Sequence, residues 1–287
     1  MNRILTLLIF AALLSTCQSK SQISLQNVDY EQYDVAKWDS CVMTLKDKTT
    51  LPDGELIIEI AKCFLETPYV ASTLERDTER LVVNLRELDC TTFVETVIAM
   101  ALTVKEKDRS FAAFCNNLQR LRYRNGKVND YTDRLHYFTD WIYENERNGI
   151  IKDATQQIGG EALKLDLSFM STHPESYRQL SASPERIDII REKEQEISAR
   201  TNYYALPKSR INDCATGIKT GSVVCFVTNI KGLDVSHVGF VCWQGDTLKL
   251  LHASSTAKKV IFDTRPLADY ANAVKTTTGV IILAPVF

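Results

Sequence analysis

Cys90 has the sequence context of a reactive thiol. It follows Asp89, a natural helix N-cap, and Thr92 and Glu95 behind it have the spacing of a capping box, so Cys90 is at or near the start of a predicted helix. The free backbone N–H groups and the dipole of a helix start stabilise a thiolate. They also receive the oxyanion that forms when a thiolate attacks a carbonyl. Taken alone, however, a cysteine at this position is better explained as a buried structural residue.

Two histidines supply the groups that such a thiol needs. His237 lies within residues 235–242, where alternation predicts a strand with His237 on an otherwise apolar face. A tight turn at Gly245-Asp246 follows, and His252 lies on the next predicted strand. The two histidines are at near-mirror positions about this turn, so antiparallel pairing would bring them to the same side. His237 would then act as the base and His252 as the group that orients it.

Two kinds of element must position these residues. Helical spacing dominates the first part of the chain, and strand-like character begins near residue 221. The predicted helices cover residues 29–45, 54–65, 90–104, 110–123, 132–146 and 184–198, and the predicted strands cover 80–85, 222–228, 235–243, 248–253, 261–264 and 279–284. Helices followed by an antiparallel meander predict an α+β fold.

The composition is that of a globular protein, because 45% of the 287 residues are hydrophobic and 24% are charged. Lys and Arg number 34 and Asp and Glu number 36, so there is no basic excess that would indicate a nucleic-acid partner. The eight Cys include no CxxC pair, which leaves a zinc ribbon or a thioredoxin motif without support.

The N-terminus has the pattern of an export signal. Arg3 precedes an apolar run over 4–14, and small residues follow. The sequence Leu14-Ser15-Thr16-Cys17 resembles a bacterial lipobox, in which the Cys is lipidated, and the alternative is ordinary cleavage near Thr16 with a soluble product. We therefore expect a signal over 1–17 with lipidation at Cys17, a polar tether over 18–28, and a single domain with helical insertions over 29–287. The expected location is the periplasm or cell envelope, with a lipid anchor in the membrane.

Three short motifs contain the candidate residues: DCTTFVE at 89–95, SHVGF at 236–240 and HASS at 252–255. They resemble the NlpC-type papain-like cell-wall hydrolases, and in particular their N-acetylmuramoyl-L-alanine amidase-like family. The segments TPYVASTLE at 67–75 and YTDRLHYFTDW at 131–141 fit the same family, so the resemblance runs from about residue 53 to the C-terminus. Thr91-Thr92 replaces the Ser-Gly that follows the catalytic Cys in the wider superfamily, which favours the amidase-like branch.

The resemblance implies a papain-like cysteine hydrolase core, in which a helix bearing Cys90 packs on an antiparallel sheet or partial barrel, with added helices. It makes Cys90 the nucleophile, His237 the general base and His252 the third polar residue. The implied reaction is hydrolysis of the amide that joins the muramoyl lactyl group to L-alanine, in peptidoglycan or in muropeptide fragments. No metal or cofactor is implied, and a monomer is expected.

A second group of residues is a candidate for substrate contact. Helical spacing over 132–146 would place Arg134, Tyr137 and Trp141 on one face, where aromatic rings suit sugars and a guanidinium suits a stem-peptide carboxylate. An amphipathic helix packed on the core explains the same pattern equally well. The substrate-contact candidates are Tyr69, Asp89, Tyr131, Arg134, His136, Trp141 and Ser236.

Three other functions remain open from the sequence. The same catalytic residues would serve a papain-like peptidase of the stem peptide, or an acyltransferase. Cys90, His237 and His252 could instead bind zinc, although no HExxH or CxxC signature supports this. The third is a non-catalytic envelope lipoprotein that binds cell-wall fragments, and the presence of all three residues argues against it.

Overall fold

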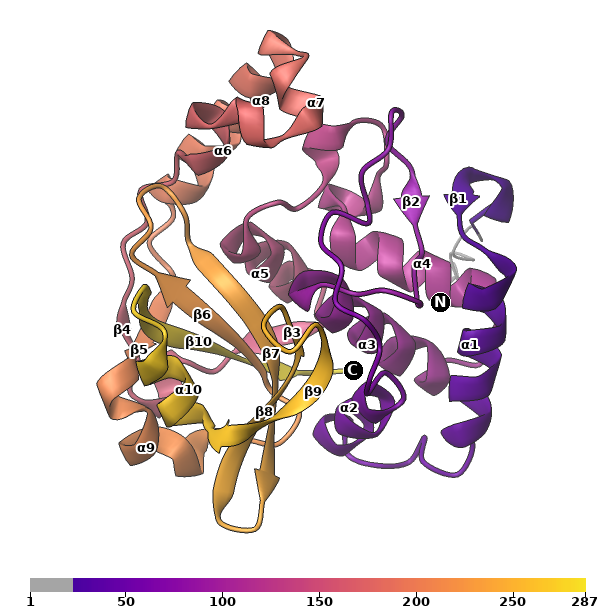
Figure 1. Ribbon diagram of the computed structural model, residues 1–287, viewed down its shortest axis with the longest axis vertical. Coiled ribbons are helices and arrows are strands. Elements are labelled where there is room, and N and C mark those ends of the chain that lie inside the picture. The colour runs from indigo at the N-terminus through magenta and orange to yellow at the C-terminus, as the bar shows by residue number, and fades with distance from the viewer. Residues whose placement is uncertain (1–22) are drawn as a thin grey trace, which may run out of the picture.

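The computed structural model describes residues 23–287 as an α+β fold, which confirms the predicted fold class (Figure 1). The helices are α1 (Gln32–Thr44), α2 (Asp53–Lys62), α3 (Cys90–Lys105), α4 (Phe111–Arg122), α5 (Phe138–Arg147), α6 (Phe169–Thr172), α7 (Arg178–Ser181), α8 (Pro184–Ala199), α9 (Ile211–Cys214) and α10 (Leu267–Ala273). The strands are β1 (Val28–Asp29), β2 (Leu81–Val82), β3 (Ile151–Asp153), β4 (Glu161–Ala162), β5 (Tyr204–Pro207), β6 (Val223–Thr228), β7 (Val235–Gln244), β8 (Thr247–Ser254), β9 (Lys259–Pro266) and β10 (Thr277–Pro285). The predicted export signal, the lipidation site Cys17 and residues 18–22 of the predicted tether lie outside the described residues.

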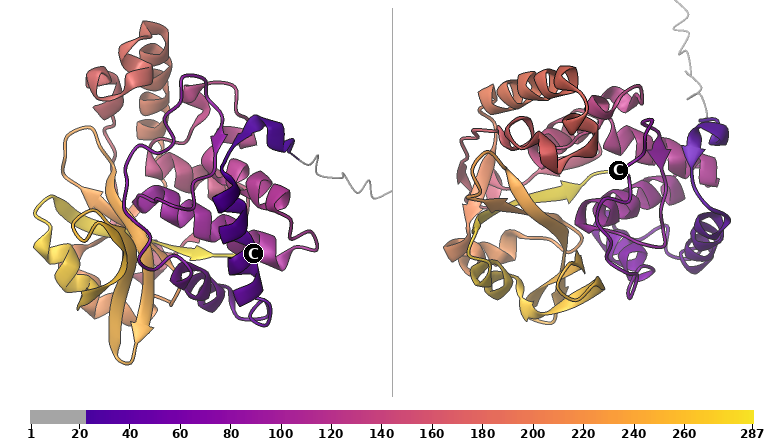
Figure 2. Two further views of the ribbon diagram at one scale, coloured as in Figure 1. Left: turned by 45° about the vertical axis from the view of Figure 1, so that its right-hand side comes forward. Right: turned by 45° about the horizontal axis from the view of Figure 1, so that its top comes forward.

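The large sheet is the middle layer of the molecule (Figure 2). Its strands run antiparallel in the order β4-β5-β10-β6-β7-β8-β9, and β3 pairs with β10 as well. One face packs against α3, where the rings of Phe93 and Phe240 meet edge-on with centroids 5.6 Å apart. The opposite face carries a second apolar core that includes Leu267 of α10 and Ile211 of α9. The sheet therefore separates α3 from α10.

The helix that bears Cys90 is held in the core. α3 is buried from Thr92 to Val104, as expected of a helix whose sequence is apolar nearly all round. Its one buried carboxylate, Glu95, accepts a hydrogen bond from Arg122 of α4 at 2.7 Å, and Arg122 also donates to the carbonyl of Val82 at 2.6 Å. These contacts fix α3 between α4 and the sheet, and so fix its first turn.

The helix predicted over 132–146 is wrong in its first part. Asp130 caps a short 3-10 turn at Tyr131–Asp133, the chain is extended at Arg134, and regular helix begins only with α5. The backbone of Arg134 instead forms an isolated antiparallel bridge with Tyr123. Because the helix starts after Arg134, the single helical face that was expected to carry Arg134 and the α5 aromatics does not form.

The predicted tether is also wrong where the structure describes it. Val28 is 6% exposed and pairs with Leu81 in a two-residue parallel ladder between β1 and β2. The backbone N–H of Ile23 donates to the side chain of Asn116 at 3.1 Å. Apolar residues within this polar stretch pack on the domain, so residues 23–28 belong to it.

Within residues 23–287, no helix is both long and apolar enough to cross a membrane.

The helices α6 to α8 form a projection at one end of the molecule (Figure 1). Leu180 and Ile190 lie in an apolar cluster of this projection. The same cluster includes Tyr131 and Tyr137, which lie just before α5 in the chain. No helix or strand was predicted over 158–174, because the elements there are short and are ordered by this shared cluster. The projection is therefore joined to the segment that precedes α5.

Candidate active site

Cys90 is the first residue of α3, as the sequence predicted. The carboxylate of Asp89 accepts the backbone N–H of Thr92 at 2.8 Å, and the Thr92 hydroxyl accepts the backbone N–H of Asp89 at 2.9 Å. This reciprocal capping box makes Thr92 the N3 residue, one of the two frames that the sequence allowed. The cap fixes the direction in which the helix begins and leaves the Cys90 side chain partly exposed.

The sheet divides where Cys90 approaches it. β7 pairs with β8 from Gln244↔Thr247 as far as Phe240↔Leu251. Before Phe240, β7 pairs with β6, and beyond Leu251, β8 pairs with β9. At this division the backbone N–H of Val238 lies close enough to the Cys90 sulfur to lower the pKa of its thiol. The start of α3 therefore lies against β7 one residue away from His237.

The two histidines meet as the near-mirror positions indicated. His237 Nε2 lies 2.6 Å from His252 Nδ1, and the rings are nearly perpendicular, with centroids 4.9 Å apart. Because this contact occupies Nε2 of His237, its Nδ1 is the ring nitrogen left for another partner. Gly239 permits the contact, since a Cβ at that position would lie 2.9 Å from the Cβ of His252. The space beside Gly239 is thus filled by His252.

A buried carboxylate fixes the start of β7. Asp234, which is 2% exposed, accepts the backbone N–H of Thr139 at 2.8 Å and its hydroxyl at 2.7 Å. Just before it, the carbonyl of Gly232 accepts the N–H groups of Ser168 and Phe169 at 3.1 and 3.0 Å. The loop that leads into the His237 strand is therefore tied to α5 and to α6.

Two tyrosines border the thiol and the histidines. The ring of Tyr270, on α10, lies edge-on to His252 with centroids 5.3 Å apart and 6.0 Å from the ring of His237. Tyr69 lies within electrostatic range of Cys90 and Asp89, and burial with these neighbours raises the pKa of Tyr69 to about 12. The sequence singled out Tyr69 but missed Tyr270, because no pattern marked the seven-residue helix α10.

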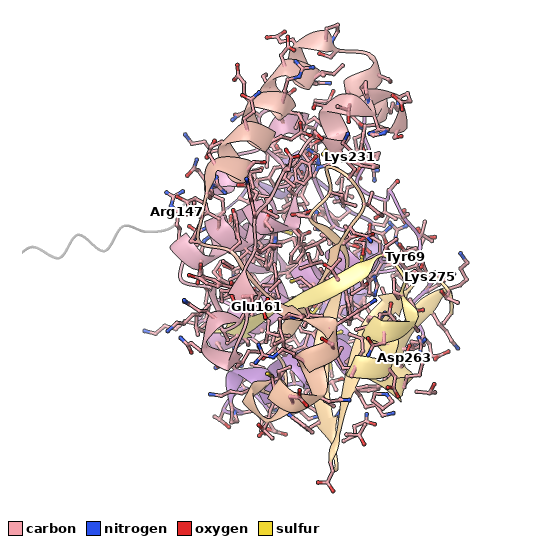
Figure 3. The ribbon with its side chains drawn as sticks, turned by 90° about the vertical axis from the view of Figure 1, so that its left-hand side faces the viewer. Tyr69, Arg147, Glu161, Lys231, Asp263 and Lys275 are labelled. Atoms are coloured by element: carbon pink, nitrogen blue, oxygen red, sulfur yellow. The ribbon has the colours of Figure 1, made fainter. Side chains whose placement is uncertain are left out.

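A carboxylate on β9 was also missed. Asp263 Oδ2 lies 3.8 Å from His252 Nε2, and Arg265 donates to both oxygens of Asp263 at 2.9 Å. Asp263 lies on the side of the sheet that α10 covers (Figure 3). His252 pairs with Ile261, and strand alternation from Ile261 places Asp263 on the same face as His252; the alternation was visible in the sequence, but the pairing was not.

Burial makes the resting site neutral. Burial and the nearby Asp89 carboxylate raise the pKa of the Cys90 thiol to about 12, against the opposing hydrogen bonds from Val238 and Thr91. Burial and His252 lower the pKa of His237 to about 3, and burial lowers the pKa of His252 to about 4. Burial of the thiol therefore opposes the stabilisation of a thiolate that a helix start offers.

Three of the predicted substrate-contact residues lie around Cys90 and His237. Tyr69 is half-buried, Asp89 is partly exposed and serves as the helix cap, and Ser236 is exposed directly before His237. Figure 3 shows Tyr69 near the surface of the molecule. These three residues stay candidates for contact with a substrate.

Of the other four predicted contact residues, three are buried and His136 is half-buried. Arg134 is 7% exposed and donates to Glu79 and Glu75, with distances of 2.7 and 2.8 Å for the shortest bond to each. Its guanidinium is therefore already paired with two carboxylates. Tyr131 is 2% exposed, and its carbonyl lies 2.8 Å from Nε2 of His136. Trp141 has no exposed surface and stacks on a neighbouring ring in α5, so the core-packing explanation applies to it.

Metal binding finds no support in the part of the chain that the structure describes. Among residues 23–287, no group of three or more His, Cys, Asp or Glu side chains is placed to hold a metal ion. The seven Cys of this range are free thiols, and those of α4 and β6 are buried among apolar side chains.

The chain belongs to the AmiA-like family of N-acetylmuramoyl-L-alanine amidase-like proteins, whose model matches residues 59–280. It is similar to the crystal structure of an N-acetylmuramoyl-L-alanine amidase from Bacteroides uniformis ATCC 8492, with 40% identity and a TM-score of 0.79 over 82% of this chain and 99% of that one. No curated protein matches the sequence. The family gives the chain a cell-wall amidase-like function and a peptidoglycan-related substrate.

Two further solved structures share the fold. One, described as a candidate xylanase from Bacteroides fragilis, is 42% identical, with a TM-score of 0.75 over 78% of this chain and 98% of that one. The other, a Legionella pneumophila protein, is 22% identical, with a TM-score of 0.67 over 90% of this chain and 97% of that one. At that identity the Legionella protein supports the fold alone.

Proposed function

We propose that this protein hydrolyses the amide between the muramoyl lactyl group and L-alanine in peptidoglycan or muropeptides. Cys90 is the nucleophile, His237 the general base and His252 the residue that orients it. The observation that carries the proposal is the 2.6 Å contact between the two imidazoles at the division of the sheet that Cys90 approaches. The choice of bond is supported by the family and by the amidase from Bacteroides uniformis.

The reaction begins from a neutral thiol and a neutral imidazole. As the Cys90 sulfur attacks the lactyl carbonyl, its proton passes to Nδ1 of His237, and the backbone N–H of Cys90 donates to the oxyanion. The imidazolium of His237 then protonates the leaving amine of L-alanine. A water molecule, deprotonated by Nδ1 of His237, attacks the thioester; the C–S bond breaks to release the muramoyl product with a free carboxylate, and His237 returns the proton to the Cys90 sulfur.

His252 stabilises the charged intermediate state of this cycle. When His237 holds two protons, its Nε2–H donates to Nδ1 of His252 across the 2.6 Å contact. The proton transfer is unfavourable in the resting site, since the pKa of Cys90 is raised and that of His237 is lowered. Attack on the substrate carbonyl together with this proton transfer avoids a separate thiolate–imidazolium pair in the resting site.

The proposal is tested by product analysis with defined muropeptides. Wild-type protein is expected to release an intact stem peptide with a free L-alanine amino group, identified by mass, and Cys90→Ala is expected to release none. Cys242→Ala, which removes another partly exposed free thiol, is the matched control and is expected to keep wild-type activity. Equal activity of Cys90→Ala and wild type would contradict the assignment, and products cut within the stem would establish the peptidase instead.

We further propose that the protein acts outside the cytoplasm as a single-domain monomer. The family supports export, and the apolar run before Cys17 supports a lipid anchor in the membrane. Cys17→Ser is expected to move the protein from the membrane fraction to the soluble fraction. An unchanged distribution would contradict the anchor, and size-exclusion chromatography of the protein without residues 1–17 measures the oligomeric state.

A further inference from the structure

One ring nitrogen of His252 has no role in the proposed reaction. Its Nδ1 contacts His237, whereas its Nε2 is buried and makes no hydrogen bond within residues 23–287. Burying a ring nitrogen without a partner is unfavourable. The carboxylate of Asp263, which is 7% exposed, lies 3.8 Å from this nitrogen. That distance is too long for a hydrogen bond, so the resting interaction is electrostatic.

The proposed chemistry requires one particular set of protons on the two rings. Nδ1 of His237 must be unprotonated to accept the thiol proton, so the neutral His237 ring carries its proton on Nε2. That proton is donated to His252, whose Nδ1 must then be the unprotonated nitrogen. The remaining proton of His252 is therefore on Nε2, the nitrogen that faces Asp263. A carboxylate at this position favours this tautomer over the other one.

The groups around Asp263 keep it charged and in place. Arg265 donates to both carboxylate oxygens at 2.9 Å, and the backbone N–H of Arg265 donates to Oδ1 at 2.9 Å. The guanidinium of Arg265 also lies over the ring of Tyr270, 4.9 Å from its centroid, and Tyr270 is the ring that packs edge-on against His252. Among the charged groups of the described residues, Asp263 and Arg265 are those that act electrostatically on His252.

We propose that Asp263 is a positioning residue that selects the Nε2–H tautomer of His252 and, through it, leaves Nδ1 of His237 free to accept the thiol proton. The inference rests on the proposed function of Cys90 and His237. During the reaction His237 becomes positively charged, while His252, which lies between His237 and Asp263, stays neutral. The negative charge of Asp263 therefore offsets the positive charge on His237. Arg265 donates to both oxygens of Asp263, whose carboxylate lies 3.8 Å from His252.

The test compares Asp263→Asn with wild type by two independent measurements. Turnover of a muropeptide is expected to show a kcat lower by roughly 10- to 100-fold with little change in KM, the range seen when the carboxylate that orients a metal-bound histidine is removed. Nitrogen-15 NMR of histidine-labelled wild-type protein is expected to show the neutral His252 ring protonated at Nε2. In the variant, the single proton is expected to exchange between Nε2 and Nδ1, so that both tautomers are populated. Asp269→Asn, at an exposed carboxylate on α10, is the matched control and is expected to change neither measurement.

The outcomes separate this inference from the proposed function. If the wild-type protein shows no hydrolysis that depends on Cys90, the proposed function is wrong. The NMR measurement would still decide the role of Asp263. An unchanged tautomer and an unchanged kcat in Asp263→Asn would overturn the inference. If Asp263→Asn unfolds, Arg265→Gln tests the same point while keeping the carboxylate, and the Nε2–H tautomer of His252 is expected to persist. Its loss in Arg265→Gln would overturn the inference.

Discussion

Replacing Gly239 by Ala tests whether the geometry of the histidine pair matters for the reaction. A Cβ at this position would lie 2.9 Å from the Cβ of His252, 3.0 Å from Leu250 Cδ1 and 3.0 Å from the carbonyl oxygen of Leu251. Non-bonded carbon atoms prefer about 3.5 Å or more. Two of the three contacts involve backbone or Cβ atoms, so a rotamer change cannot relieve them, and β8 must move by about half an ångström at His252.

That displacement predicts two measurable effects. Overpacking of this kind lowers the free energy of unfolding by about 1–3 kcal/mol. A shift of about half an ångström lengthens the 2.6 Å contact between the two imidazoles by a similar amount. Since a misplacement of about 1 Å reduces the rate about 100-fold, we expect kcat/KM to fall about tenfold.

The assay pairs urea denaturation with muropeptide hydrolysis, and Gly245→Ala is the control. Gly245 lies in the turn of the same hairpin at φ 58°, and a Cβ added there would meet no atom within 4 Å, so alanine strains only the backbone. Its free energy of unfolding is expected to fall by about 1–2 kcal/mol with kcat/KM unchanged. Wild-type kcat/KM in Gly239→Ala, or equal losses of activity in the two variants, would refute the reasoning.

Three further predictions concern titration. A hydrogen bond with Cys41 lowers the pKa of the half-buried Cys63, whereas burial raises that of Cys90. Iodoacetamide at about pH 7.5 should therefore modify Cys63 before Cys90, as peptide mapping would show, and faster labelling of Cys90 would contradict this order. Asp89→Asn keeps the helix cap but removes the charge that raises the pKa of Cys90, so the alkylation rate of Cys90 should increase, and a decrease would show that the cap was lost. Burial and Arg134 lower the pKa of His136 from 6.5 to about 3, so this ring stays neutral in the folded state. The contribution of His136 to the free energy of unfolding is therefore fully present above pH 6.5 and is lost as the pH falls towards 3. His136→Gln should therefore flatten the fall in unfolding free energy between pH 6.5 and 4, and an unchanged slope in urea titrations would exclude His136 as its source.

Local patterns predicted the position of Cys90 at a helix start and the contact between the two histidines. The position of Cys90 follows from the cap residue directly before it, and the contact of His237 with His252 follows from strand alternation about a two-residue turn. Each inference needed only short-range sequence information, since the period of a strand and the length of a hairpin fix which side chains share a face.

Long-range contacts decided what the sequence did not predict. Arg134 was a plausible ligand for a substrate carboxylate, but Glu75 and Glu79 reach it from a loop more than fifty residues earlier in the chain. Tyr270 lies against the histidines only because α10 packs on the sheet face that carries them. No periodicity along the chain reports which charged or aromatic side chains will meet across such distances.

The order of strands in the sheet has a consequence for when the site can exist. β10, the C-terminal strand, lies between β5 and β6, and β6 in turn pairs with the His237 strand. Cys90 and His237 are separated by about half of the 287 residues. Contacts so distant in sequence form late and slowly in folding. A chain still emerging from synthesis or translocation therefore has its Cys90 thiol before the sheet that carries His237 is complete.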